Sequence, residues 1–291
     1  MATTESQTPS SASPRGDGPH FEPALAGEWD ACHLAARDTV VDTLRALGVE
    51  PAALDHVARL RLYYRSMFLL SCWADDAATR RTLTTDLAMH VVSMKLLDDL
   101  MDADSGLDAF DLGISSLRLL LLGTERLSRH GACRELLQSQ ERHFDSVCSG
   151  QLRCKREPAT DLESWLLYAR DYGGRFLSAY GRFGGLAAGL GERASIPESF
   201  AWGFGMIITI ADDLTDHVRH GERIGNLGAM LIDGVVGPEE VESVLEDERA
   251  RACDAAAALP TAYDLRPVVD VYADDIRRRI MPRLLAGTFV R

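Results

Sequence analysis

Apolar residues recur at every third or fourth position along most of the chain, which is the spacing of one face of an α-helix. The pattern starts near Trp29, and its breaks coincide with Gly or Pro, as at Pro158 and Pro238. Alternating strand patterns and hairpin turn signals are nearly absent. The sequence therefore predicts an all-α helical bundle. We expect helices at about 28–47, 52–75, 80–103, 107–129, 132–155, 162–189, 196–219, 238–258 and 266–286.

The first residues differ from the rest, because they hold Ser, Thr, Pro and Gly without an apolar run. We therefore expect a disordered tail over residues 1–25 and one helical domain over 26–291. No signal peptide and no continuous apolar run of 18 residues is visible, so we expect a cytoplasmic protein without a membrane span. Six cysteines without zinc-type spacing are expected to be reduced thiols.

The charge balance limits the partners of the protein. The 291 residues carry a formal net charge of −13, and nucleic-acid-binding proteins usually present a basic face. We therefore exclude nucleic acid as a partner. An acidic protein that binds an anionic substrate needs metal ions or a few well-placed Arg and Lys side chains.

A first acidic motif, DDLMD, follows an apolar run that ends at Leu97. Asp98 and Asp102 are four residues apart and share one helix face, with Asp99 beside them. Like charges at this spacing repel each other, so a helix that keeps them needs a compensating cation. The motif indicates a divalent cation at the mouth of an apolar interior.

A second motif, DDLTD, follows another apolar run. It repeats the arrangement with Asp212, Asp213 and Asp216. One such motif is as well explained by a solvated acidic helix end. Two of them, each after a long apolar run in a helical chain, favour a shared acidic mouth over an apolar pocket.

This arrangement suits a ligand with a diphosphate head and a hydrocarbon tail. Magnesium is usually held by one or two carboxylates together with substrate phosphates, so we expect Mg²⁺ as the cofactor and all six aspartates as its ligands and as catalytic residues. Bound Mg²⁺ would make the diphosphate a leaving group, and apolar walls would keep water from an allylic cation that an acceptor alkene attacks.

Basic and polar side chains near the motifs are candidates for holding the substrate. For each basic residue, a solvated surface charge is the competing interpretation. Met94 lies one turn before Asp98 and is expected to influence the length of the allylic donor, while Ser93 and Tyr172 are candidate proton acceptors. The predicted substrate-binding residues are Arg61, Arg65, Ser93, Met94, Lys95, Gln151, Tyr172, Gly173, Arg175 and Arg223.

At these residues the chain resembles the trans-isoprenyl diphosphate synthases, over about residues 50 to 235. The resemblance implies the isoprenoid synthase fold, Mg²⁺ and a homodimer. Gly150-Gln151 is similar to the family's Gly-Gln element, and Tyr172-Gly173 lies where the family usually has Lys-Thr. The paired arginines that usually follow the first motif are absent, because that segment reads ADSGLD. In the family those arginines hold isopentenyl diphosphate, so the acceptor is expected to differ.

Longer strings resemble the prenyltransferases of moenomycin-type phosphoglycolipid biosynthesis more closely. These strings are LRLYYR, VSMKLLDDLMDADSGLD, SGQLRCKR, YGGRFLSAYG and ADDLTDHVRHGERIGNL. The resemblance implies transfer of a C10 unit from geranyl diphosphate to the farnesyl chain of a phosphoglycerate-linked glycolipid. The product would be the branched C25, moenocinyl-type chain of a phosphoglycolipid antibiotic. The amphiphilic acceptor makes peripheral membrane contact a possible further feature.

Three alternatives remain open. An ordinary short-chain polyprenyl diphosphate synthase would also carry two aspartate motifs, but is disfavoured by the missing arginines. A class I terpene cyclase usually has a different second motif, in which Asp216 and His220 would be replaced by Ser or Thr and Glu. A non-catalytic synthase subunit would need neither motif.

Overall fold

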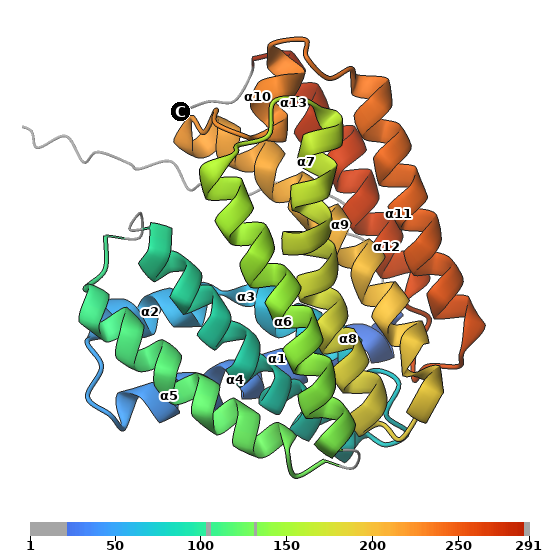
Figure 1. Ribbon diagram of the computed structural model, residues 1–291. Coiled ribbons are helices and arrows are strands. Elements are labelled where there is room, and N and C mark those ends of the chain that lie inside the picture. The colour runs from blue at the N-terminus through green and yellow to red at the C-terminus, as the bar shows by residue number, and fades with distance from the viewer. Residues whose placement is uncertain (1–21, 103–105, 131–132, 288–291) are drawn as a thin grey trace, which may run out of the picture.

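The computed structural model describes residues 22–102, 106–130 and 133–287, and within them every regular element is a helix. Figure 1 shows these helices arranged as one bundle around α4 and α9. The elements are α1 (Pro23–Arg45), α2 (Pro51–Arg59), α3 (Arg61–Ser71), α4 (Ala77–Asp102), α5 (Ala109–Leu127), α6 (Cys133–Arg156), α7 (Leu162–Ala169), the π-helix η1 (Arg170–Arg175), α8 (Phe176–Ala187), the 3-10 helix η2 (Gly191–Ala194), α9 (Ser195–His220), α10 (Leu227–Ile232), α11 (Pro238–Ala258), α12 (Arg266–Asp275), the π-helix η3 (Ile276–Ile280) and α13 (Met281–Leu285).

The two helices that carry the aspartate motifs occupy the middle of the bundle. Helix α4 packs against α1, α3 and α5, while α9 packs against α8, α10, α11 and η1. The two groups meet where α8 contacts α3 and α4. Large side chains such as Tyr64, Phe68, Tyr180 and Phe204 are fully buried between them. Both motifs therefore sit at the ends of helices whose preceding turns are fixed by a continuous apolar core.

The observed helices differ from the expected ones in four places. The helix expected at 52–75 is divided at Leu60, whose ψ of 48° takes it out of the helical region. The helix expected at 162–189 contains the π-helical η1, and a short helix, α10, follows α9. The first helix starts at Pro23, because proline is favoured in the first turn and Leu25 is already buried. Most of the predicted tail, residues 1–21, lies outside the described residues.

Close backbone packing joins η1 to α9. A Cβ atom on Gly173 would lie 1.9 Å from Oγ1 of Thr209, and one on Gly205 would lie 2.5 Å from the carbonyl oxygen of Gly173. Only glycine permits this approach. The packing places Tyr172, which precedes Gly173 on η1, beside the cavity described below.

Two further features concern the state of the cysteines and the burial of one long apolar helix. The five described cysteines, Cys32, Cys72, Cys148, Cys154 and Cys253, are free thiols. One helical stretch, Gly191–His220, is long and apolar enough to cross a membrane by length and composition alone. However, 61% of its apolar window is buried inside the bundle, as expected for the central helix of a helical core.

Candidate active site

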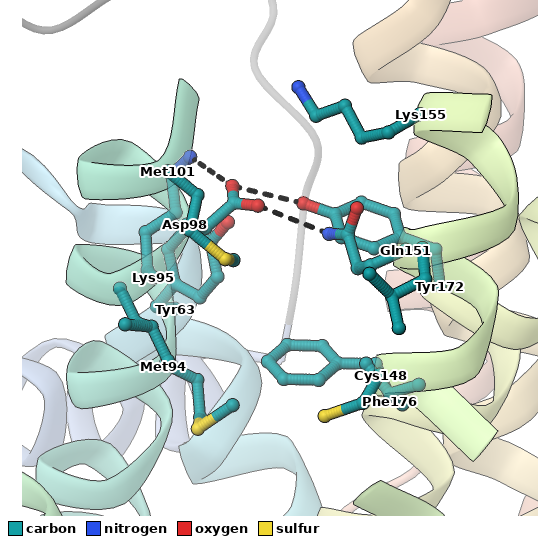
Figure 2. A pocket seen from close by; sticks show the side chains of 13 residues that line it. Tyr63, Met94, Lys95, Asp98, Met101, Cys148, Gln151, Lys155, Tyr172 and Phe176 are labelled. Carbon is teal, nitrogen blue, oxygen red and sulfur yellow. Dashed lines mark hydrogen bonds and ion pairs between the residues drawn. The ribbon is translucent and has the colours of Figure 1, made fainter. Parts of the chain in front are cut away.

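Asp98 connects two walls of a cavity. Its carboxylate accepts hydrogen bonds from Lys95 Nζ at 2.8 Å, from Tyr172 Oη at 3.1 Å and from Gln151 Nε2 at 3.2 Å. Lys95 belongs to the same helix, α4, whereas Gln151 comes from α6 and Tyr172 from η1 (Figure 2). Four of the predicted site residues therefore meet at one carboxylate.

The neighbouring Asp99 faces inward and is 5% exposed. It accepts hydrogen bonds from His56 Nε2 at 2.7 Å and forms an ion pair with Lys95 Nζ at 2.8 Å. Burial would raise the pKa of Asp99, but the hydrogen bonds from His56 and Lys95 outweigh it and hold that pKa below its ordinary value. The Lys95 ammonium thus lies between both carboxylates and compensates the like charges that the sequence pattern placed side by side.

Below Asp98 opens a largely apolar cavity of about 440 Å³. Figure 2 shows Met94 and Phe176 facing each other below the carboxylate, and Lys155 on the opposite side from them. A hydrocarbon chain fits the apolar part, while the cations near Asp98 suit an anionic head. The lining residues are Tyr63, Met94, Lys95, Leu97, Asp98, Met101, Val147, Cys148, Gln151, Leu152, Lys155, Tyr172 and Phe176.

Two aspartates of the second motif have different surroundings: one is held by hydrogen bonds to other elements, and the other is accessible to solvent. Asp213 Oδ2 accepts hydrogen bonds from the Trp165 indole at 2.7 Å and from the Leu227 backbone N–H at 2.9 Å. These bonds tie α9 to α7 and to the start of α10. Burial raises the pKa of Asp213 to about 6, although both bonds oppose the shift.

Asp212 is exposed on α9. Partial loss of hydration beside the surrounding protein, together with the negative charges of Asp216 and Asp213, raises the pKa of Asp212 to about 7. The charge of Lys95 opposes that shift, so the two motifs lie within electrostatic range of each other. Burial raises the pKa of the Tyr63 hydroxyl, and the charges of Asp212, Asp98 and Asp99 act together in the same direction.

The raised pKa of Asp212 predicts a pH dependence of stability without divalent ions. The folded state holds this proton more tightly than the unfolded chain, so the stabilisation is present at low pH and is lost as pH rises through about 7. Thermal melting in EDTA should therefore give a lower Tm at pH 8 than at pH 5.5, and Asp212→Asn should reduce that difference. An unchanged pH profile in the variant would contradict the assignment.

Several other predicted residues lie outside the cavity. Ser93 is fully buried and donates to the His90 carbonyl oxygen at 2.6 Å, which makes it part of the core of α4. Gly173 is a packing position against α9. Asp102 ends α4, and its side chain lies outside the described part of the chain.

The predicted arginines are also placed elsewhere. Arg65 stacks on the Trp29 ring and pairs with Asp30 at 3.6 Å, while Arg61 is exposed at the start of α3. Arg175 pairs with Asp171 at 2.9 Å and lies over Trp202.

The last of them, Arg223, pairs with Asp233 at 2.5 Å beside the end of α9. Each of these guanidinium groups therefore either pairs with a carboxylate or faces solvent. The spacing of residues along the sequence did not reveal these surroundings.

Besides apolar lining residues, three residues with charged or hydroxyl-bearing side chains at the site were not predicted. His56 comes from α2, Tyr63 from α3, and Lys155 from the last turn of α6. Tyr63 and Lys155 lay inside the strings LRLYYR and SGQLRCKR, so the resemblance contained a signal for them. His56 carried none, because its partner Asp99 is 43 positions away.

The candidate metal ligands suit a hard divalent ion, because they are carboxylate oxygens near the ends of two helices. Among the described residues, no group of three or more His, Cys, Asp or Glu is already gathered around one point. Lys95 instead occupies the space between Asp98 and Asp99. Besides loss of hydration, the negative charges of Asp216 and Asp213 raise the pKa of Asp212, and this excess negative charge is the feature that fits a bound cation.

Comparisons with solved structures agree with this architecture. A geranylgeranyl pyrophosphate synthetase from Geoglobus acetivorans superposes with a TM-score of 0.68 at 13% identity, over 88% of this chain and 99% of that one. A polyprenyl synthase from Roseobacter denitrificans gives 0.66 at 16% identity, over 88% and 98%. A geranylgeranyl pyrophosphate synthase from Corynebacterium glutamicum, complexed with calcium and isoprenyl diphosphate, gives 0.59 at 19% identity, over 88% and 98%.

Sequence comparison adds no closer relationship, since no family model and no curated protein matches the chain. At identities below one fifth, the structural likeness establishes the fold. The predicted fold class is confirmed: this chain has the all-α isoprenoid synthase fold that these prenyl synthases share.

Proposed function

We propose that the protein is a Mg²⁺-dependent prenyltransferase that uses an allylic diphosphate donor. The observation that carries this proposal is the position of Asp98, at the charged end of an apolar cavity and within electrostatic range of the second aspartate motif. The neighbouring structures are prenyl synthases, and one of them holds calcium and isoprenyl diphosphate. A divalent ion and a prenyl diphosphate are therefore the ligands that best suit this site.

In this proposal Asp98, Asp99 and Asp102 of the first motif and Asp212 and Asp216 of the second hold the metal. When bound, Mg²⁺ neutralises the diphosphate and turns it into a leaving group. Asp213 acts indirectly, because its hydrogen bonds to Trp165 and Leu227 fix the end of α9. Its role is to position the other two carboxylates.

The chain's own side chains perform the remaining tasks. Lys95 and Lys155 supply positive charge at the head of the cavity, and Gln151 and Tyr172 fix the rotamer of Asp98. The apolar walls exclude water from the allylic cation. The Tyr172 hydroxyl stays protonated, because burial and the charge of Asp98 raise its pKa well above the ordinary value. It therefore acts as a hydrogen-bond donor in the resting site rather than as the base.

For the donor and acceptor we propose geranyl diphosphate and the farnesyl chain of a phosphoglycerate-linked glycolipid, giving a branched C25 chain for phosphoglycolipid antibiotic synthesis. Support comes from the sequence strings that resemble this class of transferase and from the missing paired arginines after the first motif. Of the predicted basic groups, only Lys95 lines the cavity, which leaves few cations for a second diphosphate.

An ordinary short-chain polyprenyl diphosphate synthase is the second candidate, because the neighbouring structures are enzymes of that kind. A class I cyclase and a non-catalytic subunit rank below it. A class I cyclase would use a similar donor cavity but usually has a different second motif, and a non-catalytic subunit would need neither motif. We further propose that the enzyme works in the cytoplasm, with peripheral membrane contact where its amphiphilic acceptor resides.

The donor half of the proposal is tested by thermal melting with geranyl diphosphate. A ligand that binds only the folded state raises Tm. We expect Mg²⁺ and geranyl diphosphate together to raise Tm more than the sum of their separate effects. If neither ligand shifts Tm in the presence of the other, the donor site is misassigned.

Met94 is expected to set the length of the donor. Its side chain lines the cavity opposite Phe176, below Asp98 (Figure 2). Met94→Ala removes volume from the wall, so the ratio of kcat/KM for farnesyl diphosphate over geranyl diphosphate should rise about tenfold. The exposed Met101, also on this wall, provides a matched Met101→Ala control nearer the head. Equal donor ratios in wild type and Met94→Ala would place the floor of the cavity elsewhere.

A homodimer is proposed on the exposed face of α5. Phe110, Ile114, Leu117 and Leu121 follow a four-three-four spacing and are 74%, 39%, 52% and 59% exposed. Such a continuous apolar stripe is unusual on an isolated domain and suits association with a second copy. Sedimentation velocity should show a dimer at micromolar concentration, and Leu117→Arg should shift it to monomer. A wild-type monomer would contradict the proposal.

A further inference from the structure

A second hollow, of about 910 Å³, lies beside the end of α9 and is lined by arginines. Arg219 and Arg223 border it from the end of α9 and the following loop, and Arg279 and Arg283 border it from η3 and α13. None of its lining residues is acidic. This is a marked local concentration of positive charge on a chain whose net charge is −13.

Helix-end electrostatics explains part of this cluster. Cations near a helix C-terminus are favoured by the helix dipole, which accounts for Arg219 and His220 in the last turn of α9. The same effect favours Arg283 in the last turn of α13, but it does not explain why arginines from α9, the following loop, η3 and α13 converge on one hollow. Bringing them together costs electrostatic energy unless a negative charge compensates them.

The ion pairs of Arg223 and Arg279 leave some of the N–H donors of each guanidinium available. Arg223 Nη2 pairs with Asp233, and Arg279 uses Nε and Nη2 toward Asp275. A guanidinium has five N–H donors, so each retains donors for a further ligand. The paired carboxylates of Asp233 and Asp275 restrict the positions of these two guanidinium groups, which favours bidentate recognition of a phosphate or carboxylate.

From this geometry we propose that the hollow binds the anionic head of the acceptor, a phosphate ester with a nearby carboxylate. The Thr215 hydroxyl adds a polar group, and Val218 and Ile280 add an apolar surface. The hollow directly adjoins the second aspartate motif, because Thr215 belongs to that motif and His220 lies 3.9 Å from Asp216. The acceptor would thus be held by its head outside the apolar cavity, while its chain enters beside the donor.

This inference rests on the proposed function only for the identity of the ligand. Anion binding in the hollow requires neither metal nor donor, so it is measured separately from prenyl transfer. Isothermal titration of the full-length protein in EDTA, with 3-phosphoglycerate or inorganic phosphate as the probe, isolates it from the metal-dependent site. Vesicles of anionic or zwitterionic phospholipid form a third arm.

The test variant is Arg279→Gln/Arg283→Gln, and the matched control is Arg129→Gln/Arg278→Gln. The side chains of the two control arginines are 71% and 79% exposed and do not line the hollow. Their substitution removes the same amount of positive charge as the test variant does. We expect saturable 3-phosphoglycerate binding, tighter than that of phosphate, that weakens about tenfold or more in the test variant and less than about twofold in the control. Melting curves check that both variants fold.

Two binding results would overturn the proposal. The first is the absence of small-anion binding to wild type, including the case in which anionic vesicles bind through the arginines instead. The second is equal weakening of binding in both variants. Glycolipid prenylation that fails while 3-phosphoglycerate still binds would reject the proposed reaction but leave the anion site intact. Prenylation that persists with an unchanged acceptor KM in the test variant would reject the anion site alone.

Discussion

Asp98→Asn should reduce kcat/KM for prenyl transfer by at least about 100-fold while the fold is retained. The amide keeps the shape of the carboxylate but removes the charge that would hold a metal ion and that now pairs with Lys95. Gln151 and Tyr172 donate to different carboxylate oxygens, so the amide oxygen can keep one of these two hydrogen bonds in place. The loss should therefore appear in turnover rather than in Tm.

The control for this variant is Asp145→Asn. Asp145 is exposed on α6, the same helix as Gln151, and does not line the cavity. Steady-state kinetics should show wild-type activity for the control. Comparable activity in Asp98→Asn and wild type would remove the metal assignment, and a collapse of Tm in Asp98→Asn would show a structural role instead.

Gly173→Ala should lower the free energy of unfolding by about 2 kcal/mol or more. The new methyl group would lie 1.9 Å from Thr209 Oγ1 and 3.2 Å from the Gly205 carbonyl oxygen. Helix α9 would have to move away from η1. Because Tyr172 precedes this contact and donates to Asp98, activity should also fall.

Two comparisons isolate the cause of this effect. Gly27→Ala places a methyl group on α1 with no atom within 4 Å, so urea unfolding should show little change. Thr209→Ala removes the clashing hydroxyl, so the double variant Gly173→Ala/Thr209→Ala should recover part of the lost stability. Absence of coupling between the two substitutions would exclude the proposed clash as the cause.

The central helices could be predicted from the sequence, because long amphipathic or apolar runs determine them. The helices expected at 80–103 and 196–219 correspond to α4 (Ala77–Asp102) and α9 (Ser195–His220). The break at Leu60 could not be predicted, since no Gly or Pro marks it. The π-helical turn of η1 was also missed; its Gly173 packs closely against α9, a contact between residues distant in the sequence.

The residues of the candidate site could likewise be predicted only in part. Helical spacing placed Met94, Lys95 and Asp98 on one side of the cavity, and the structure brings Gln151 and Tyr172 opposite them. The arginines failed to join them because their partners, such as Asp30 for Arg65 and Asp233 for Arg223, are chosen by tertiary packing. Charge alone does not reveal which partner a flexible side chain finds.

The contrast between the two aspartate motifs follows from their surroundings. Asp99 is held charged by His56 and Lys95, whereas Asp212 has two acidic neighbours and only distant cations. The first motif is thus compensated within the protein, and the second depends more on an external cation. A residue pattern repeated twice in the sequence therefore gives two electrostatically different halves of one site.

The most direct test of the proposed function is a paired incubation with geranyl diphosphate and Mg²⁺. One reaction contains isopentenyl diphosphate, the other contains a farnesylated phosphoglycerate glycolipid, and both are analysed by mass spectrometry. We predict a C10 mass gain on the glycolipid alone. Elongation of geranyl diphosphate with isopentenyl diphosphate, without change to the glycolipid, would instead identify an ordinary chain-elongating synthase and contradict the proposed acceptor.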